Sequence, residues 1–126
     1  MPYWYPTTPF DNNREMWRGV HRDHGITRAC DFYTKRNLWS LARLWNEFSM
    51  PKDEDVSSHL LFILTSCFGH LEKLTRYKFK RGGNSALNGT LYVGSFTVED
   101  MPLRLLESKL AQVIKGFSML FSRNKR

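Results

Sequence analysis

Apolar residues recur at three- and four-residue steps in three stretches of the chain, which is the pattern of amphipathic helices. The first stretch runs from Thr34, whose side chain suits a helix N-cap, to about Met50, where Pro51 follows. Its apolar stripe consists of Leu38, Leu41, Ala42, Trp45 and Phe48. We therefore expect a helix over 34–50 that buries one face.

The second stretch, about Asp55 to Leu74, is apolar nearly all round in its middle, which is typical of a central, buried helix. The third begins near Glu99-Asp100 and tolerates Pro102 in its first turn. Its stripe consists of Leu103, Leu106, Leu110, Ile114, Phe117 and Phe121. Together the three patterns predict three main helices around one core.

A short β element is predicted between the second and third helices. Gly82-Gly83 and Asn88-Gly89 are strong turn signals, and the run Thr90–Val93 has β-type residues. The alternating segment Arg76–Lys80 would pair with Leu91–Val93 in a small hairpin. The expected fold class is thus mainly α with a small β-hairpin, that is, α+β.

Residues 1–30 show no helical periodicity, because three prolines interrupt the first nine positions. The large apolar surfaces of this segment belong to Tyr3, Trp4, Tyr5, Phe10 and Trp17. We expect an irregular arm whose aromatics anchor it over the body; beside the arm's arginines they would alternatively stack on nucleic-acid bases. Residues 1–126 then form a single domain, with the arm at 1–30 and a helical body with the short β element at 31–126.

The charge balance points to anionic partners. The chain carries 19 Lys and Arg against 12 Asp and Glu, a formal net charge of +7, which favours nucleic acid first and a membrane surface second. The longest apolar run, Leu60–Leu64, is far too short to span a membrane, and the N-terminus lacks a secretory signal. Cys30 and Cys67 are then interpreted as reduced thiols, and we expect a soluble, cytoplasmic protein.

Residues for catalysis are sparse. Cys67 lies between His59 and His70, yet it stands in the apolar stretch, where a buried core cysteine is the stronger interpretation. His21 and His24 have a two-residue spacing but no second ligand pair of the kind a zinc site needs. The acidic pairs stand at predicted helix starts, and the glycines match no phosphate-binding loop. We expect no catalytic residue, no cofactor and no metal.

Two basic clusters are the candidate nucleic-acid-binding residues. Arg36 and Arg43 are seven residues apart, so they project from one helix face, and Lys35 is adjacent. The second cluster consists of Arg76, Lys78, Lys80 and Arg81. Such side chains bind phosphate oxygens, which suits contact with a DNA backbone. The alternative is a solvated helix face with an Arg43–Glu47 pair worth roughly a few tenths of a kcal/mol.

The segment DFYTKRNLWSLARLW, Asp31 to Trp45, resembles part of the large bacterial DNA methyltransferases that modify exocyclic amino groups of adenine or cytosine. The family pattern (L/F)-(F/Y)-T-x-R-(N/Q)-L-x-x-L is matched by Tyr33, Thr34, Arg36, Asn37, Leu38 and Leu41. The opening YWYP, Thr65-Ser66, GTLYVGSFTVEDM over Gly89–Met101 and the helix end Lys115-Gly116 also match, in the family's order. The resemblance covers most of the chain.

This resemblance implies a segment that lies between the two catalytic portions of the full enzyme. The family's Gly-rich S-adenosylmethionine motif and its (Asp/Asn)-Pro-Pro-(Tyr/Phe) motif do not occur here, and its Glu-x-Asn is replaced by Glu99-Asp100-Met101. It therefore implies a non-catalytic accessory domain that contacts DNA or a methyltransferase catalytic domain. The alternative is a protein–protein interaction module or small homo-oligomer, whose interface aromatics would be Trp4, Trp17 and Trp39.

Overall fold

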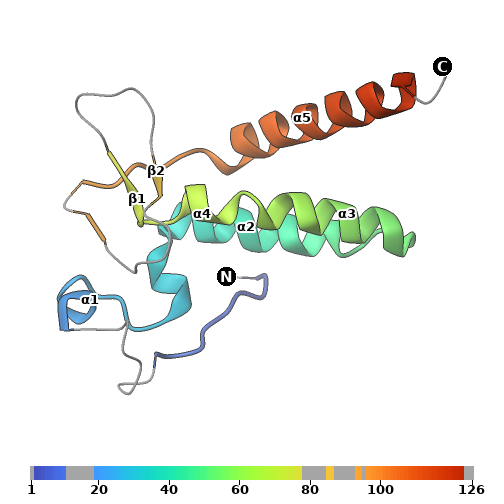
Figure 1. The fold of residues 1–126 in the computed structure, drawn as a ribbon. Helices are drawn as coiled ribbons and strands as arrows, with labels where there is room; N and C mark the ends of the chain where they lie inside the picture. The colour runs from blue at the N-terminus through green and yellow to red at the C-terminus, as the bar shows by residue number, and fades with distance from the viewer. Residues whose placement is uncertain (1, 11–18, 78–84, 87–92, 95, 124–126) are drawn as a thin grey trace.

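The computed structural model describes residues 2–10, 19–77, 85–86, 93–94 and 96–123. The elements in chain order are α1 Gly19–Asp23, the 3-10 turn η1 Ala29–Phe32, α2 Lys35–Phe48, α3 Glu54–Thr65, α4 Phe68–Leu71, β1 Thr75–Arg76, β2 Ser85–Ala86 and α5 Pro102–Arg123. The described chain is mainly helical, as the sequence predicted. Figure 1 shows α2 and α3 lying alongside each other, with α5 above them in this view.

Helix α2 confirms the predicted start and stripe. Thr34 is the N-cap, and its Oγ1 accepts a hydrogen bond from the backbone N–H of Asn37 at 3.2 Å. Leu41 and Ala42 are buried on the inner face. The helix ends at Phe48, two residues before Met50, which lies in the irregular link ahead of Pro51.

The predicted helix over 55–74 is wrong in its second half, because the chain breaks into α3 and α4. Hydroxyl groups at the end of α3 bond to backbone carbonyls: Thr65 Oγ1 donates to Phe62 O at 2.8 Å and Ser66 Oγ to Ile63 O at 2.7 Å. Such local bonds compete with continuation of a helix. The expectation of burial all round also fails at Phe62, whose exposed fraction is 75%.

The main hydrophobic core lies between α2, α3, α4 and the first half of α5. Its buried members are Leu41, Ile63, Leu64, Cys67, Leu71 and Leu106. A smaller cluster of Ile26, Phe32 and Leu74 fixes the segment before α2 to the chain after α4. Helix α5 contacts both α2 and α3, so the three predicted helices do share one core.

The β structure of the described chain consists of two paired two-residue strands and two isolated antiparallel bridges. β1 and β2 run antiparallel, with Thr75 opposite Ala86 and Arg76 opposite Ser85. The predicted turns at 82–83 and 88–89, and most of the predicted strand Leu91–Val93, lie outside the described residues. The small β-hairpin, and with it the α+β class, stays a prediction.

The N-terminal arm packs over the body through its aromatics, as predicted for residues 2–10. The Tyr3 ring meets Trp39 edge-on at 6.1 Å, and Phe10 meets Phe32 in the same way at 5.8 Å. The Phe10 N–H also donates to Thr27 O at 2.9 Å. The remainder of the predicted irregular region is not wholly irregular, because α1 and the start of η1 fall within it.

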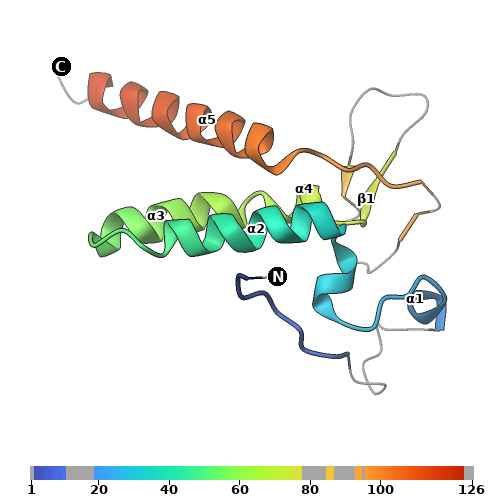
Figure 2. The same cartoon turned by 180° about the vertical axis from the view of Figure 1, so that it is seen from behind.

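Helix α5 packs against the core through one face of its first half alone, and Leu103, predicted as part of the stripe, lies off this face and is 55% exposed. Leu106 is buried and Leu110 packs at the margin of the core, whereas every residue from 111 to 122 is exposed. Figure 1 shows the reason: α5 diverges from α2 and α3 toward its C-terminal end, and Figure 2 shows the same divergence from behind. The apolar stripe predicted for this helix therefore runs beyond the core. Among the described residues no helix has the length and apolar composition that a membrane crossing needs.

Candidate functional site

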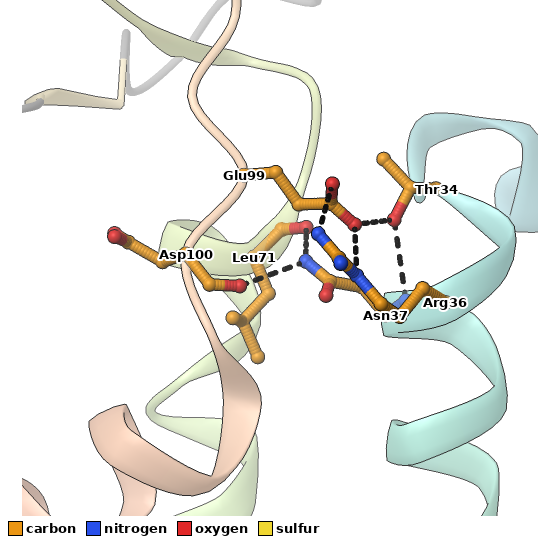
Figure 3. A network of polar contacts seen from close by, with 6 residues as sticks. All are labelled: Thr34, Arg36, Asn37, Leu71, Glu99 and Asp100. Atoms are coloured by element: carbon orange, nitrogen blue, oxygen red, sulfur yellow. Dashed lines mark hydrogen bonds and ion pairs between the residues drawn. The ribbon is translucent and has the colours of Figure 1, made fainter.

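Arg36, predicted to contact phosphate, forms an ion pair within the chain. Its Nη2 lies 2.7 Å from Glu99 Oε2 and its Nε lies 3.2 Å from Glu99 Oε1, a two-point contact (Figure 3). Thr34 Oγ1 donates to the same Oε1. These two hydrogen-bond donors lower the pKa of Glu99, Thr34 contributing first and Arg36 next. Arg36 nevertheless keeps 77% of its side chain exposed, so its outer face is open to solvent.

Asn37 is fully buried and ties three segments together. Its Nδ2 donates to Leu71 O at 3.1 Å, at the end of α4, and to Asp100 O at 3.2 Å, just before α5 (Figure 3). Its Oδ1 is buried without a hydrogen-bond partner in the described chain. Since a buried amide is expensive unless bonded, Asn37 fixes where α5 leaves the body.

The motif that carried the family resemblance therefore has a structural role. Thr34, Arg36 and Asn37 all contact the Glu99–Asp100 segment, more than sixty positions away along the chain. The sequence predicted a helix cap at Thr34 and a phosphate contact at Arg36, but it did not predict the contacts of these residues with Glu99 and Asp100. The one signal for it was an Asn in an otherwise apolar inner helix face.

Arg43 fits the solvated-face alternative in its contacts. Its Nε lies 4.0 Å from Glu47 Oε1, one turn along α2, and its guanidinium lies 5.9 Å from the Trp39 ring centroid. Both contacts are exposed and weak. Trp39, an expected interface anchor, is 40% exposed beside this guanidinium.

A basic hollow lies between the arm and the start of α2. Its volume is about 920 Å³, and the cationic residues that line it are Arg28, Lys35, Arg36 and Lys73. Lys73 Nζ donates to Asp31 O at 2.7 Å, which holds this side chain against the hollow's wall. Lys35 and Arg36 were predicted site residues, whereas Arg28 and Lys73 were not: Arg28 lies before the predicted helix, and Lys73 comes from a distant segment after α4.

The second predicted cluster lies largely beyond the described chain. Lys78, Lys80 and Arg81 are outside the described residues, and of Arg76 the backbone in β1 is described. The structure therefore neither brings these residues to the basic hollow nor separates them from it.

Both cysteines are buried, in agreement with the core interpretation of Cys67. Burial raises the pKa of both thiols, and Cys67 Sγ donates to Ile63 O at 3.5 Å. A buried thiol of raised pKa is a poor nucleophile. His21 is buried while His24 is exposed. In the described part of the chain no three His, Cys, Asp or Glu side chains gather as metal ligands would.

The exposed second half of α5 carries a continuous apolar surface, here called the free face. Its members are Val113, Ile114, Phe117, Leu120 and Phe121, each at least 36% exposed. Their three- and four-residue spacing continues the line of Leu106 and Leu110, so one helix face passes from the core into solvent. Exposed apolar patches of this kind mark interaction surfaces.

Comparison with known proteins adds no relative to this picture. No family model matches the chain, and neither a curated protein nor a solved structure matches it.

Proposed function

We propose that the chain is a non-catalytic accessory domain of the DNA-methyltransferase type, which docks on a catalytic partner domain and presents a basic surface to DNA. The observation that carries the proposal is the free face of α5. The DNA contact and a cytoplasmic location belong to the same proposal and rest on the net charge of +7 and on the family resemblance.

The free face supports docking because its apolar side chains continue the core without a cover in the described chain. Phe117 is 49% exposed and Phe121 is 68% exposed, although Leu106 on the same stripe is buried. Removing such side chains from water would contribute about 25 cal/mol for each Å² covered. A segment that lies between two catalytic portions of a larger enzyme would present this kind of surface to them.

The contacts of the motif favour the methyltransferase type over an unrelated helical module. Two blocks of the family pattern, one around Thr34–Asn37 and one ending at Glu99–Asp100, touch each other directly. A pattern whose separate blocks support one another is expected when the pattern records a common fold.

The basic hollow supports the DNA contact. Lys35 and Arg36 line it together with Arg28 and Lys73, and Arg43 follows two turns along α2 from Arg36. Arg36 and Arg43 already have carboxylate partners, so phosphate would compete with Glu99 and Glu47 for them. The predicted residues Arg76, Lys78, Lys80 and Arg81 would extend the same surface.

The experiment is analytical ultracentrifugation of the chain, alone and mixed with the catalytic domain of an S-adenosylmethionine-dependent amino-group methyltransferase from the same organism. We expect a mixed complex that Phe117→Asp weakens by about tenfold or more, because a charge would enter a buried apolar contact. Met119→Asp is the matched control, since Met119 is 56% exposed, against 49% for Phe117, but lies about 200° around the helix from it.

The second candidate function is a homodimer that forms through the free face. A twofold interface pairs the same surface of both copies, so the free face alone could form it. In that case the chain alone sediments as a dimer, Phe117→Asp gives a monomer and Met119→Asp does not. A chain that stays monomeric and forms no mixed complex at high concentration contradicts both candidates.

A further inference from the structure

A second cavity lies where the arm meets α2 and α4; it adjoins the basic hollow, with which it shares Tyr5, Tyr33 and Leu38, and lies apart from the free face of α5. Its volume is about 400 Å³, within the range of small-molecule pockets. The residues of its lining that matter here are Trp4, Tyr5, Tyr33, Trp45, Phe68 and Glu72. None of the candidate DNA contacts is among its described lining residues.

Aromatic side chains make up half of the described lining of this pocket, and aliphatic side chains such as Leu38 and Leu41 make up most of the rest. Phe68 stands between the other two inner rings: Tyr33 meets it edge-on at 6.5 Å and 78°, and Trp45 is tilted against it at 6.4 Å and 43°. Trp4, 72% exposed, stands at the rim on the arm. Because aromatic faces carry negative partial charge, rings arranged around a space attract a cation placed within it.

One carboxylate completes the pocket. Glu72 is the only charged residue among the described lining residues, and its side chain is half-buried. Its backbone pairs with that of Tyr33 in an isolated antiparallel bridge, which fixes it beside the rings. Its carboxylate has neither a hydrogen bond nor an ion pair with another described residue, in contrast to Glu47 and Glu99.

The half-buried carboxylate of Glu72 has no cation beside it among the described residues. Burial raises the pKa of Glu72, and burial together with the Glu72 charge raises the pKa of Tyr33 to about 12. Both shifts mean that negative charge in the pocket is poorly compensated. A cation between the rings and Glu72 would relieve this cost.

We propose that the aromatic pocket between the arm, α2 and α4 binds a small organic cation of the methylated ammonium class, held by the rings of Tyr33, Trp45 and Phe68 and by the carboxylate of Glu72. A methylated ammonium suits the site because its methyl groups fill apolar space and its hydration is weak. A bare ammonium would lose more hydration on entry, and an anion would face both the ring faces and Glu72. This binding is independent of the proposed docking and DNA contact.

The test compares choline with its uncharged isostere 3,3-dimethylbutan-1-ol, titrated into the full chain at constant ionic strength. Binding is followed by the NMR signals of the tryptophan indole N–H groups, which include those of Trp4 and Trp45. We expect choline to bind about tenfold more tightly than the alcohol, because the two differ in charge rather than in shape.

Glu72→Gln keeps the size of the side chain and removes its charge. In this variant we expect the choline affinity to fall several-fold toward that of the alcohol, with a remaining preference for choline that comes from the rings, while the alcohol affinity stays unchanged. Glu47→Gln is the matched control, because it removes an exposed carboxylate outside the pocket and should leave choline binding as it was. Trp4→Ala, a change at an exposed rim residue, should also weaken choline and gives a second reading if Glu72→Gln loses its fold.

Three results overturn the proposal. The first is equal affinity for choline and the alcohol, which would make the pocket a neutral apolar site. The second is choline binding that Glu72→Gln and Trp4→Ala leave unchanged. The third is the absence of any indole shift on addition of choline.

Discussion

Arg36 on α2 and Glu99 ahead of α5 form a two-point ion pair across 63 positions of the chain, with Nη2 and Oε2 2.7 Å apart. The pair joins the motif that begins α2 to the segment that aims α5. Arg36, predicted from its charge to contact phosphate, thus also links the start of α2 to the segment before α5. The same arrangement leaves its outer face exposed for a competing anion.

Replacing Glu99 by Gln should lower the free energy of unfolding at pH 7 by no more than about 1 kcal/mol, because the pair is exposed. The pKa of Glu99 is lower in the folded protein than its ordinary value of 4.5, so this contribution is fully present above pH 4.5. It is lost as the pH falls through the lower folded-state pKa. Urea unfolding of both proteins at pH 7 and at a series of pH values below 4.5 measures this; a difference that does not shrink as the pH falls would contradict the assignment.

Replacing Asn37 by Ala should destabilise the protein by about 2 kcal/mol or more, because two carbonyl oxygens lose their buried donor and a cavity opens. Thermal or urea unfolding measures the change. Asn46→Ala is the control on the same helix: Asn46 is partly exposed, and we expect a change within about 0.5 kcal/mol. Equal effects of the two substitutions would mean that Asn37 does not fix the start of α5.

Glu99→Gln should strengthen binding to duplex DNA, because it releases Arg36 from its carboxylate partner. Glu107→Gln makes the same change of net charge at an exposed position on α5 that is not among the residues lining the basic hollow. We expect Glu99→Gln to steepen the slope of log affinity against log salt concentration by up to the amount that about one phosphate contact contributes. Glu107→Gln should change this slope less. Fluorescence anisotropy at several salt concentrations measures both. Identical gains in DNA affinity in the two variants would mean that overall net charge, rather than the release of Arg36, causes the stronger binding.

Substitution of Arg36 and Arg43 together by Gln should weaken DNA binding and flatten its salt dependence by up to about two phosphate contacts. The structure adds that Lys35→Gln should flatten it further, since Lys35 is an exposed cation on the rim of the same hollow. Affinity that is unchanged in the double variant, or no binding at low salt, would remove DNA from the proposed partners.

Cys30 and Cys67 should react with a thiol reagent at least about tenfold more slowly in the native protein than in urea at pH 8. Both side chains are buried, and burial raises the pKa of each, so little thiolate is present. Absorbance during reaction with Ellman's reagent gives the two rates. Fast reaction of either thiol in the native protein would mean that this thiol is accessible and could act as a nucleophile.

The predictability of the fold differs between its elements for physical reasons. The start of α2 followed from local chemistry, because an N-cap threonine and a helical stripe act within one turn. The break between α3 and α4 was missed, because Ser66 and Cys67 are not helix breakers by type; the break depends on hydroxyl bonds such as that from Ser66 to Ile63 O. An apolar stripe in a sequence also does not indicate whether other parts of the same chain cover it. On α5 the core covers Leu106, whereas Phe117 on the same stripe is exposed.

The candidate site was partly predictable. The cationic side chains were visible as sequence clusters, but their carboxylate partners, Glu99 above all, were not, because the contact spans 63 positions. The gathering of Arg28 and Lys73 beside Lys35 likewise depends on the tertiary fold. The aromatic pocket with Glu72 combines segments from the arm, α2 and α4, so no local pattern announces it.

The divergence of α5 from the body has a consequence for its backbone. Residues 111–122 are all exposed in the described chain, and isolated helices shorter than about 12–15 residues are marginal in water. Amide hydrogens of this half should therefore exchange with solvent much faster than those of 105–110. A partner that covers the free face would slow the exchange of these amide hydrogens. Binding would then be coupled to stabilisation of the second half of α5, and the apolar burial would give a markedly negative heat-capacity change.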